Sequence, residues 1–325
     1  MALQPPNDQR TGRTARLGLG LAAIGRPSYI TLGRDADLPS DRSPAVLEAR
    51  AHQLLDAADD LGIGYVDAAR SYGLAEAFLS SWLHTSGATP FVASKWGYRY
   101  TADWQPDAVH HEVKDHTRPT LERQLAETRE LLGAWLRLYQ VHSLTLDSPL
   151  WADQQLVRRL AELRAAGTEL GFSTSGPTQA EAVRRGLALT VDGLPLFTSV
   201  QTTWNLLEPS AGDALAEAHA MGARVVVKEA LANGRLTDRA PEEGTGLQQV
   251  ARTRGVGSDA VAIAGALTQP WCDVVLSGAV TVPQLKSNAA ALDLVADIDP
   301  AELSELVTPE PAAEYWGTRS RLGWA

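Results

Sequence analysis

Apolar residues recur along this chain in two alternating patterns. Short apolar runs bounded by glycine, proline or polar residues predict strands, and longer stretches with apolar residues every three or four positions predict helices. The clearest helical stretch follows Ser43 and Pro44, where we expect a capping hydroxyl and then a proline at the first helical position. Its apolar stripe consists of Leu47, Ala51, Leu54, Leu55, Ala58 and Leu61.

The two patterns alternate from residue 17 to residue 292. Alternation of strand and helix favours a parallel sheet, and eight strands favour a closed (β/α)8 TIM barrel, an α/β fold in which 1–325 form a single domain. Residues 1–15 are polar and expected to be loose, and the loop 26–42 is long enough to cover part of a site. Strands are expected at 17–22, 63–66, 91–95, 135–142, 168–172, 197–201, 223–228 and 273–277. Helices are expected at 74–84, 119–132, 153–166, 178–187, 211–221, 245–254, 258–268 and 282–292.

Three of the predicted strands end in an ionisable side chain. Asp67 follows one, Lys95 ends FVASK, and His142 ends WLRLYQVH, while Tyr72 lies five residues after Asp67 in a turn with Gly73. If the faces of these strands point into one barrel, the acid, the lysine and the histidine converge at its C-terminal mouth, where barrel enzymes place their chemistry. The residues expected on those faces are Tyr65 with Asp67, Phe91 and Ala93 with Lys95, and Leu136, Leu138 and Gln140 with His142.

Each of these residues also has an ordinary structural interpretation. Asp67 could cap the loop, Lys95 could be a salt-bridge partner at the barrel mouth, and His142 could be a core histidine with satisfied hydrogen bonds. For any single residue that interpretation would be the more common one. Together with Tyr72, however, the structural interpretation requires four coincidences in the right order.

Composition narrows the possible partners. A formal net charge of −10 argues against nucleic acid and anionic membranes, so a small molecule is the expected partner; the sequence does not indicate an oligomeric state. No run approaches the roughly 18 apolar residues of a spanning helix, and we expect a soluble, cytoplasmic protein. The single cysteine, Cys272, lies in an apolar run and is expected to be a buried, inert thiol.

Two polar or aromatic stretches bear on the site. In HHEVKDH, His111 and His116 are five residues apart and miss the i, i+4 spacing of a zinc helix, so we expect a polar loop near the pocket and no metal site. KWGYRYTADW places Trp96, Tyr98, Tyr100 and Trp104 just after Lys95. Packing and substrate contact are both open for these rings, although we favour Trp96 as a site-lining residue for an apolar or ring-bearing substrate.

With Asp67, Tyr72, Lys95 and His142 in this order, the chain resembles the aldo-keto reductases, in the branch of bacterial reductases and potassium-channel β-subunits. The likeness runs from RLGLGLAAIG at residue 16 to SGAVTVPQLKSN ending at residue 288. It implies that Tyr72 donates a proton to a carbonyl, that Asp67 keeps Lys95 charged, and that His142 orients the substrate. An ammonium about 4 Å from a phenolate interacts by roughly 4 kcal/mol, enough to lower a phenol pKa by up to about three units.

The resemblance also implies a tail, 299–325, over the barrel mouth, with Trp316 or Trp324 as its covering ring.

The resemblance implies a nicotinamide cofactor, NADPH by default, with NADH possible. Lys228 stands where many members stack an aromatic ring on the nicotinamide, and with Glu229 it could form a charged pair instead. Thr174 replaces a frequent asparagine, and Val280, Thr281 and Gln284 replace the Arg or Lys that binds the 2′-phosphate in NADPH-preferring members. The implied cofactor-binding residues are Gly20, Ser173, Gln201, Lys228, Ala230, Leu231, Asn233, Gly234, Arg235, Leu236, Gly278, Ala279, Gln284 and Asn288.

Three functions follow from these patterns. The first is NAD(P)H-dependent reduction of an aldehyde or ketone, or the reverse reaction. The second is a nicotinamide-binding regulatory subunit with little turnover, as channel β-subunits are. The third, which the histidine cluster supports weakly, is a metal-dependent barrel isomerase or hydrolase.

Overall fold

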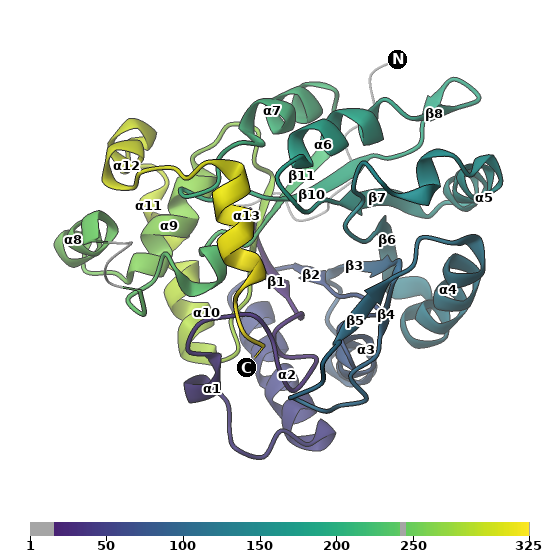
Figure 1. The fold of residues 1–325 in the computed structure, drawn as a ribbon. Helices are drawn as coiled ribbons and strands as arrows, with labels where there is room; N and C mark the ends of the chain where they lie inside the picture. Colours follow the sequence, from purple (N-terminus) through teal and green to yellow (C-terminus); the bar gives the residue numbers. More distant parts are fainter. Residues whose placement is uncertain (1–15, 241–244, 325) are drawn as a thin grey trace.

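The computed structural model describes residues 16–240 and 245–324 of the 325-residue chain. Its parallel strands close a barrel in the order β1-β12-β11-β10-β7-β6-β3-β2, which confirms the predicted (β/α)8 barrel (Figure 1). Each strand pairs with the next barrel strand along the chain, and the last returns to the first, so consecutive strand ends are neighbours around the mouth. The barrel strands are β1 (Leu17–Gly20), β2 (Tyr65–Asp67), β3 (Phe91–Trp96), β6 (Leu136–Val141), β7 (Glu169–Ser173), β10 (Ser199–Thr203), β11 (Arg224–Lys228) and β12 (Val274–Ser277).

Helices surround the barrel (Figure 1), and their apolar stripes pack on its outer wall. The helix after Ser43 begins at Pro44 as predicted, but the Ser43 side chain makes no capping hydrogen bond; its backbone N–H donates to Asp41 Oδ1 at 2.8 Å instead. The helix predicted over 282–292 is two helices that meet at Ala290. The helices around the barrel are α2 (Pro44–Asp60), α3 (Ala75–Ser86), α4 (Arg118–Leu132), α5 (Gln154–Ala165), α6 (Gln179–Leu187), α7 (Gly212–Ala220), α8 (Thr245–Arg254), α9 (Ser258–Leu267), α10 (Val282–Ala289) and α11 (Ala291–Leu294).

The inside of the barrel is a small core of its own, separate from the layer between wall and helices. Tyr65, Ala93 and Leu138 belong to it, as strand alternation predicted. Leu136, expected on the same face, instead packs against the layer between wall and helices. Gly18 on β1 fits closely against this core, because a Cβ at this position would lie 2.8 Å from Leu276 Cδ2 and 3.0 Å from the Tyr65 ring. Side chains therefore fill the inside of the barrel at this level.

Several elements that the apolar pattern did not predict lie around the barrel. Residues 98–114 contain a two-stranded hairpin, and the segment after residue 299 forms two helices. In Figure 1 the last helix, α13, crosses in front of the barrel. These elements are α1 (Arg34–Asp37), the hairpin strands β4 (Tyr98–Tyr100) and β5 (Glu112–Lys114), the hairpin strands β8 (Thr190–Val191) and β9 (Leu194–Pro195), the 3-10 turns at Gly133–Trp135, Pro149–Trp151 and Ala232–Gly234, α12 (Pro300–Leu306) and α13 (Ala312–Ser320).

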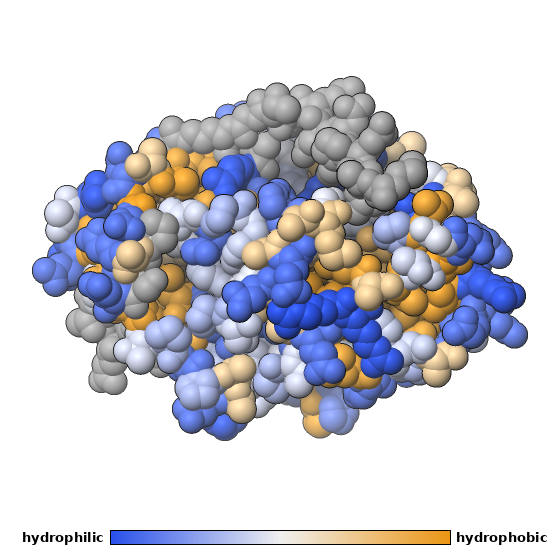
Figure 2. Space-filling view, turned by 90° about the horizontal axis from the view of Figure 1, so that it is seen from above, coloured by the Kyte–Doolittle hydropathy of each residue, from blue (hydrophilic) through white to orange (hydrophobic). Residues whose placement is uncertain are grey.

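The surface shown in Figure 2 is mostly hydrophilic, with hydrophobic residues in separate smaller groups. Among the described residues, no helix combines the length and the apolar character needed to cross a bilayer. Cys272 is buried, and burial raises the pKa of its thiol to about 12, as expected for an unreactive cysteine.

Candidate active site

A buried ion pair joins the ends of β2 and β3. The Lys95 ammonium contacts Asp67 Oδ2 and donates to the Ala68 carbonyl at 3.0 Å, and the two charged side chains are 0% and 3% exposed. Burial lowers the pKa of Lys95, and the charge of Asp67 opposes that shift. The carboxylate therefore holds the ammonium in place, and its negative charge favours the charged form of Lys95.

Two glutamines complete the environment of Asp67. Gln140 and Gln201 both donate to Asp67 Oδ1, at 3.3 and 2.9 Å. Both oxygens of this buried carboxylate thus have partners, as a buried charge requires. Gln140 is on the strand face predicted to share the barrel interior with His142. Gln201 was predicted to contact the cofactor, and its hydrogen bond to Asp67 was not predicted.

Tyr72 and His142 lie above the ion pair. The Tyr72 hydroxyl is 3.4 Å from His142 Nε2, and the two rings meet edge-on with centroids 5.4 Å apart. Lys95 Nζ is 4.8 Å from the centroid of the Tyr72 ring, and Ser71 Oγ is 3.4 Å from His142 Nδ1. The four predicted chemical residues, three on strand ends and one on the loop after β2, are therefore brought together.

The protonation states of this cluster follow from burial. Burial lowers the pKa of His142 well below its ordinary value, and the charges of Lys95 and Arg26 add to the effect, so the imidazole is neutral. Burial raises the pKa of the Tyr72 phenol well above its ordinary value, the Asp67 carboxylate adds to the rise, and Arg26 opposes it. Lys95 thus does not leave the phenol acidic by itself, because Asp67 balances the ammonium and burial disfavours the phenolate.

The histidine-rich stretch supports the site structurally. His116 Nε2 lies 2.8 Å from the backbone oxygen of His142, and its Nδ1 lies 2.8 Å from Ser148 Oγ. Burial lowers the pKa of His116 to about 4, so this ring is neutral and fixes the backbone at His142. Within 16–240 and 245–324, no group of three or more potential metal ligands comes together.

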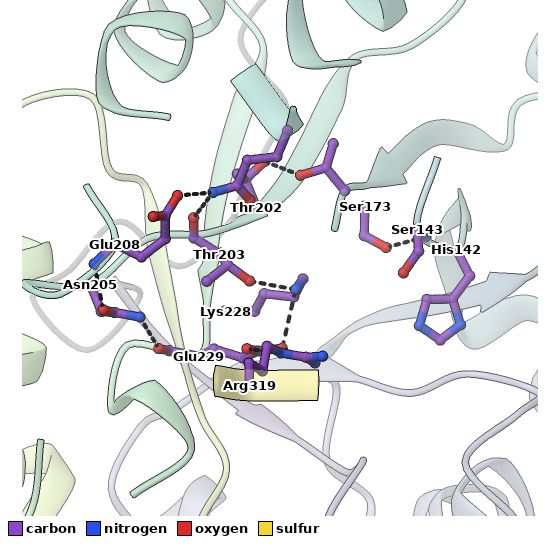
Figure 3. Close-up of polar contacts among 12 residues, drawn as sticks. His142, Ser143, Ser173, Thr202, Thr203, Asn205, Glu208, Lys228, Glu229 and Arg319 are labelled. Carbon is purple, nitrogen blue, oxygen red and sulfur yellow. Dashed lines mark hydrogen bonds and ion pairs between the residues drawn. The ribbon is translucent and has the colours of Figure 1, made fainter. Parts of the chain in front are cut away.

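A second charged cluster lies at the end of β11 (Figure 3). Lys228 Nζ donates to Thr203 Oγ1 at 2.6 Å and to Glu229 Oε1 at 3.3 Å, so the charged pair suggested by the sequence is present. Arg319 of α13 donates to both oxygens of Glu229, at 2.7 and 2.6 Å. Burial alone would raise the pKa of Glu229, but Arg319 and Lys228 lower it to about 2. The tail is thus tied to the mouth of the barrel.

The segment 230–236, which contains six of the implied cofactor-binding residues, folds onto itself as a short turn. Gly234 and Leu236 donate to the Leu231 carbonyl at 2.9 and 3.2 Å, and Asn233 adopts a φ of 57°. Buried Asn233 Oδ1 has no hydrogen-bond partner among the described residues, so this oxygen could accept a hydrogen bond from a ligand. Arg235 instead pairs with Glu310 from the tail segment.

The implied cofactor-binding residues after β12 include two that belong to a network of hydrogen bonds. Gln284 donates to Asp37 Oδ2 at 2.7 Å, and Asn288 donates to Asp259 Oδ2 at 2.6 Å. Gly278 faces open space, since a Cβ there would meet no atom within 4 Å. The remaining predicted cofactor positions lie at the ends of β1, β7, β11 and β12 or in the loop after β11: Gly20, Ser173, Lys228, Ala230, Leu231, Leu236 and Ala279.

The aromatic residues after Lys95 divide between core and mouth. Trp96 is only 1% exposed and belongs to the layer between barrel wall and helices, with its ring centroid 5.9 Å from that of His116. The Tyr98 ring is nearer to the chemistry, 4.9 Å from that of His142. Of these two rings, that of Tyr98 is the one that lies beside His142.

The sequence was compared with models of known protein families and with known proteins. The profile of the Aldo/keto reductase family matches residues 16–307, so the chain belongs to the aldo/keto reductase family. Protein tas of Escherichia coli strain K12 is 26% identical over 324 residues, covering 82% of this chain and 90% of that protein. Protein tas of Shigella flexneri matches equally. Family membership indicates an oxidoreductase that uses a nicotinamide cofactor.

Solved structures show the same fold. The aldo-keto reductase AKR11C1 from Bacillus halodurans, in a holo form, superposes with a TM-score of 0.67 at 20% identity, covering 93% of this chain and 95% of that one. A putative aldo-keto reductase from Pseudomonas aeruginosa gives a TM-score of 0.60 at 22% identity, covering 85% and 88%. At these identities the likeness concerns the barrel alone.

Proposed function

We propose that this protein reduces an aldehyde or ketone to an alcohol, or runs the reverse reaction, with Tyr72 as the proton donor. The observation that carries the proposal is the convergence of Tyr72 with His142 at 3.4 Å and with Lys95 at 4.8 Å from the ring centroid, above the buried pair with Asp67. A barrel of ordinary side chains has no hydride to give, so a bound nicotinamide would supply it.

The residues of the cluster have distinct tasks in this reaction. Neutral His142 orients the carbonyl oxygen toward the Tyr72 hydroxyl, and the phenol gives its proton to that oxygen as the alcohol forms. Lys95, fixed by Asp67, offsets charge that develops on the phenol oxygen. In the reverse direction the phenolate accepts the proton of the alcohol.

Several features support a nicotinamide site on this chain. The unpartnered Asn233 Oδ1, the open space at Gly278 and the hydroxyl of Ser173 near the end of β7 would serve a polar ligand. Ser173 Oγ accepts from the Ser143 N–H at 2.8 Å and retains its own hydrogen for donation. NADPH is the cofactor that the family resemblance implies; NADH is the alternative, favoured by the Asp37 carboxylate beside Gln284.

The test is absorbance at 340 nm with each cofactor and a panel of carbonyl compounds. Tyr72→Phe should lower kcat about 10²- to 10⁴-fold, because it removes the acid and keeps the ring. Its cofactor affinity, followed by fluorescence quenching, should stay close to that of the wild type. Turnover that persists in Tyr72→Phe would contradict the assigned proton donor.

A regulatory subunit with little turnover is the second candidate. The observation that favours it is the tie of α13 to the mouth through Arg319 and Glu229. Tight cofactor binding without turnover of any carbonyl or alcohol would select this alternative.

A further inference from the structure

A buried arginine outside the four predicted residues faces the proposed proton donor. Arg26 lies in the loop after β1 and is only 2% exposed. Its guanidinium carbon is 5.0 Å from the ring centroid of Tyr72, 4.9 Å from that of Tyr29 and 4.8 Å from that of Trp324. Three aromatic rings from three separate segments therefore surround one cation, a packing that suits guanidinium.

Hydrogen bonds fix this guanidinium in position. Arg26 donates to the Ala22 carbonyl at 3.1 Å, to the Ser71 carbonyl at 3.2 Å and to Glu112 Oε2 at 2.9 Å. The Ser71 bond holds the backbone immediately before Tyr72, so Arg26 restrains the phenol as well as facing it. Glu112 is on the hairpin strand β5, and its side chain is 23% exposed. Its charge offsets that of Arg26 from a wetter position, where solvent screens it more.

Arg26 adds to what the other charges near the phenol supply. The Asp67 carboxylate offsets part of the charge of Lys95, and His142 is neutral. Arg26 opposes the rise in the Tyr72 pKa that burial and Asp67 cause, whereas Glu112 and Glu229 add to that rise. The titratable or charged groups facing the phenol from all sides are Arg26, Tyr29, Asp67, Lys95, Glu112, His142 and Glu229.

We propose that Arg26 is a positioning residue for the reaction: it orients Tyr72 and stabilises the negative charge that the phenol acquires on giving up its proton. Trp324 of the C-terminal segment closes the aromatic box around the guanidinium. The proposal rests on the proposed function, because the charge arises only when Tyr72 transfers a proton.

The experiment compares pH profiles of alcohol oxidation, in which Tyr72 must be ionised. Removal of the cation in Arg26→Met should destabilise the phenolate and move the acidic limb of the kcat profile to higher pH. The shift should be about one pH unit for each tenfold decrease in the ionisation constant of the phenol. Arg26→Lys keeps the charge and should recover most of the shift. Glu112→Gln removes an opposing anion and should move the limb to lower pH.

Shifts of the acidic limb in opposite directions in Arg26→Met and Glu112→Gln support the proposal. The loss of a purely structural contact would lower kcat in both variants without moving the limb. An unshifted or downward limb in Arg26→Met overturns it. If Arg26→Met does not fold, the neutral polar variant Arg26→Gln takes its place: an upward shift of the limb supports the proposal, and an unshifted or downward limb overturns it.

Failure of the proposed function would look different. A wild-type protein that binds cofactor but turns over no substrate rejects the proposed function. Arg26 is then tested by ultraviolet difference titration of tyrosinate, with each variant measured against the same variant carrying Tyr72→Phe. Ionisation of Tyr72 at a higher pH in the folded neutral Arg26 variant than in the parent supports the proposal, and ionisation at the same or a lower pH overturns it.

Discussion

Arg319 donates hydrogen bonds to both carboxylate oxygens of Glu229, at 2.7 and 2.6 Å, although the two residues are 90 positions apart in the chain. The contact joins the last helix to the end of β11, where Lys228 is the second cation on the same carboxylate. Glu229 is held in a left-handed conformation with a φ of 57°, which is uncommon for a residue with a side chain. The ion pair therefore fixes both the tail and an unusual backbone position at the mouth.

The first prediction concerns the stability that this pair gives. The folded pKa of Glu229 is about 2, below its ordinary value of 4.5. The carboxylate contributes stability above about pH 4.5 that is lost as the pH falls toward 2, on the order of 3 kcal/mol in total. Arg319→Met should lower the free energy of unfolding at pH 7 by about 3 kcal/mol, because it leaves a buried charge with one partner fewer.

Urea unfolding between pH 3 and pH 7 measures this effect. On acidification the free energy of unfolding should fall more in the wild type than in Arg319→Met. Without Arg319 the pKa of Glu229 is lowered less, so its protonation removes less stability. Arg321→Met, an exposed neighbour on the same tail, is the control and should follow the wild type. Parallel pH dependences in wild type and Arg319→Met would contradict the prediction.

The second prediction concerns the close contact between Gly97 and His116. Gly97 has a φ of 106°, and a Cβ there would lie 2.5 Å from His116 Cδ2. Gly97→Ala should lower the free energy of unfolding by several kcal/mol, from a strained backbone of about 1–3 kcal/mol together with a steric clash. It should also lower kcat, because His116 holds the backbone of His142.

Gly87→Ala is the matched control, since Gly87 also has a positive φ, 71°, but faces open space. It should cost only about 1 kcal/mol and leave kcat unchanged. Equal losses in the two variants would show that the contact with His116 is unimportant.

The barrel and the strand-end positions of Asp67 and Lys95 were predictable because their signals are local, whereas the chemical roles of these residues rest on the family resemblance. A strand's alternation and its terminal residue are both readable within a few positions, as at Lys95 and Asp67. Arg26 and Arg319 gave no such signal, because their roles depend on rings and carboxylates that only the closed barrel brings near. The hairpin β4–β5 was missed because its strands are three residues each and 11 residues separate them. Helix α13 carries no clear apolar stripe in sequence.

The third prediction concerns the tail as a cover for the mouth. The Trp324 ring stacks on His111 with centroids 4.0 Å apart and planes 6° apart, and Arg26 faces the same ring. Trp324→Ala should raise the KM for carbonyl substrates about three- to tenfold, the equivalent of one lost aromatic contact. Deletion of residues 312–325 should raise it further.

Steady-state kinetics with saturating cofactor test the tail. Leu322→Ala, two residues earlier, removes apolar area from the same segment and should have a much smaller effect. Kinetics unchanged by the deletion would reject the tail as part of the site.

The last prediction concerns the choice between NADPH and NADH. Gln284 stands where the family resemblance implies 2′-phosphate binding, and its amide donates to Asp37 at 2.7 Å. Asp37 also pairs with Arg239. This end of the site therefore contains a carboxylate, and the nearby Arg239 is already paired with it. A phosphate there would meet a like charge, at a cost of about 1 kcal/mol for two charges about 4 Å apart in water.

Asp37→Asn removes that repulsion and leaves Arg239 free to meet the phosphate. The ratio of kcat/KM for NADPH to kcat/KM for NADH should rise about fivefold or more. Asp35→Asn is the control, because Asp35 lies two residues away and pairs with Arg42 on the surface. The cofactor ratio of that variant should match the wild type, while an unchanged or lower ratio in Asp37→Asn would place the 2′-phosphate away from Asp37.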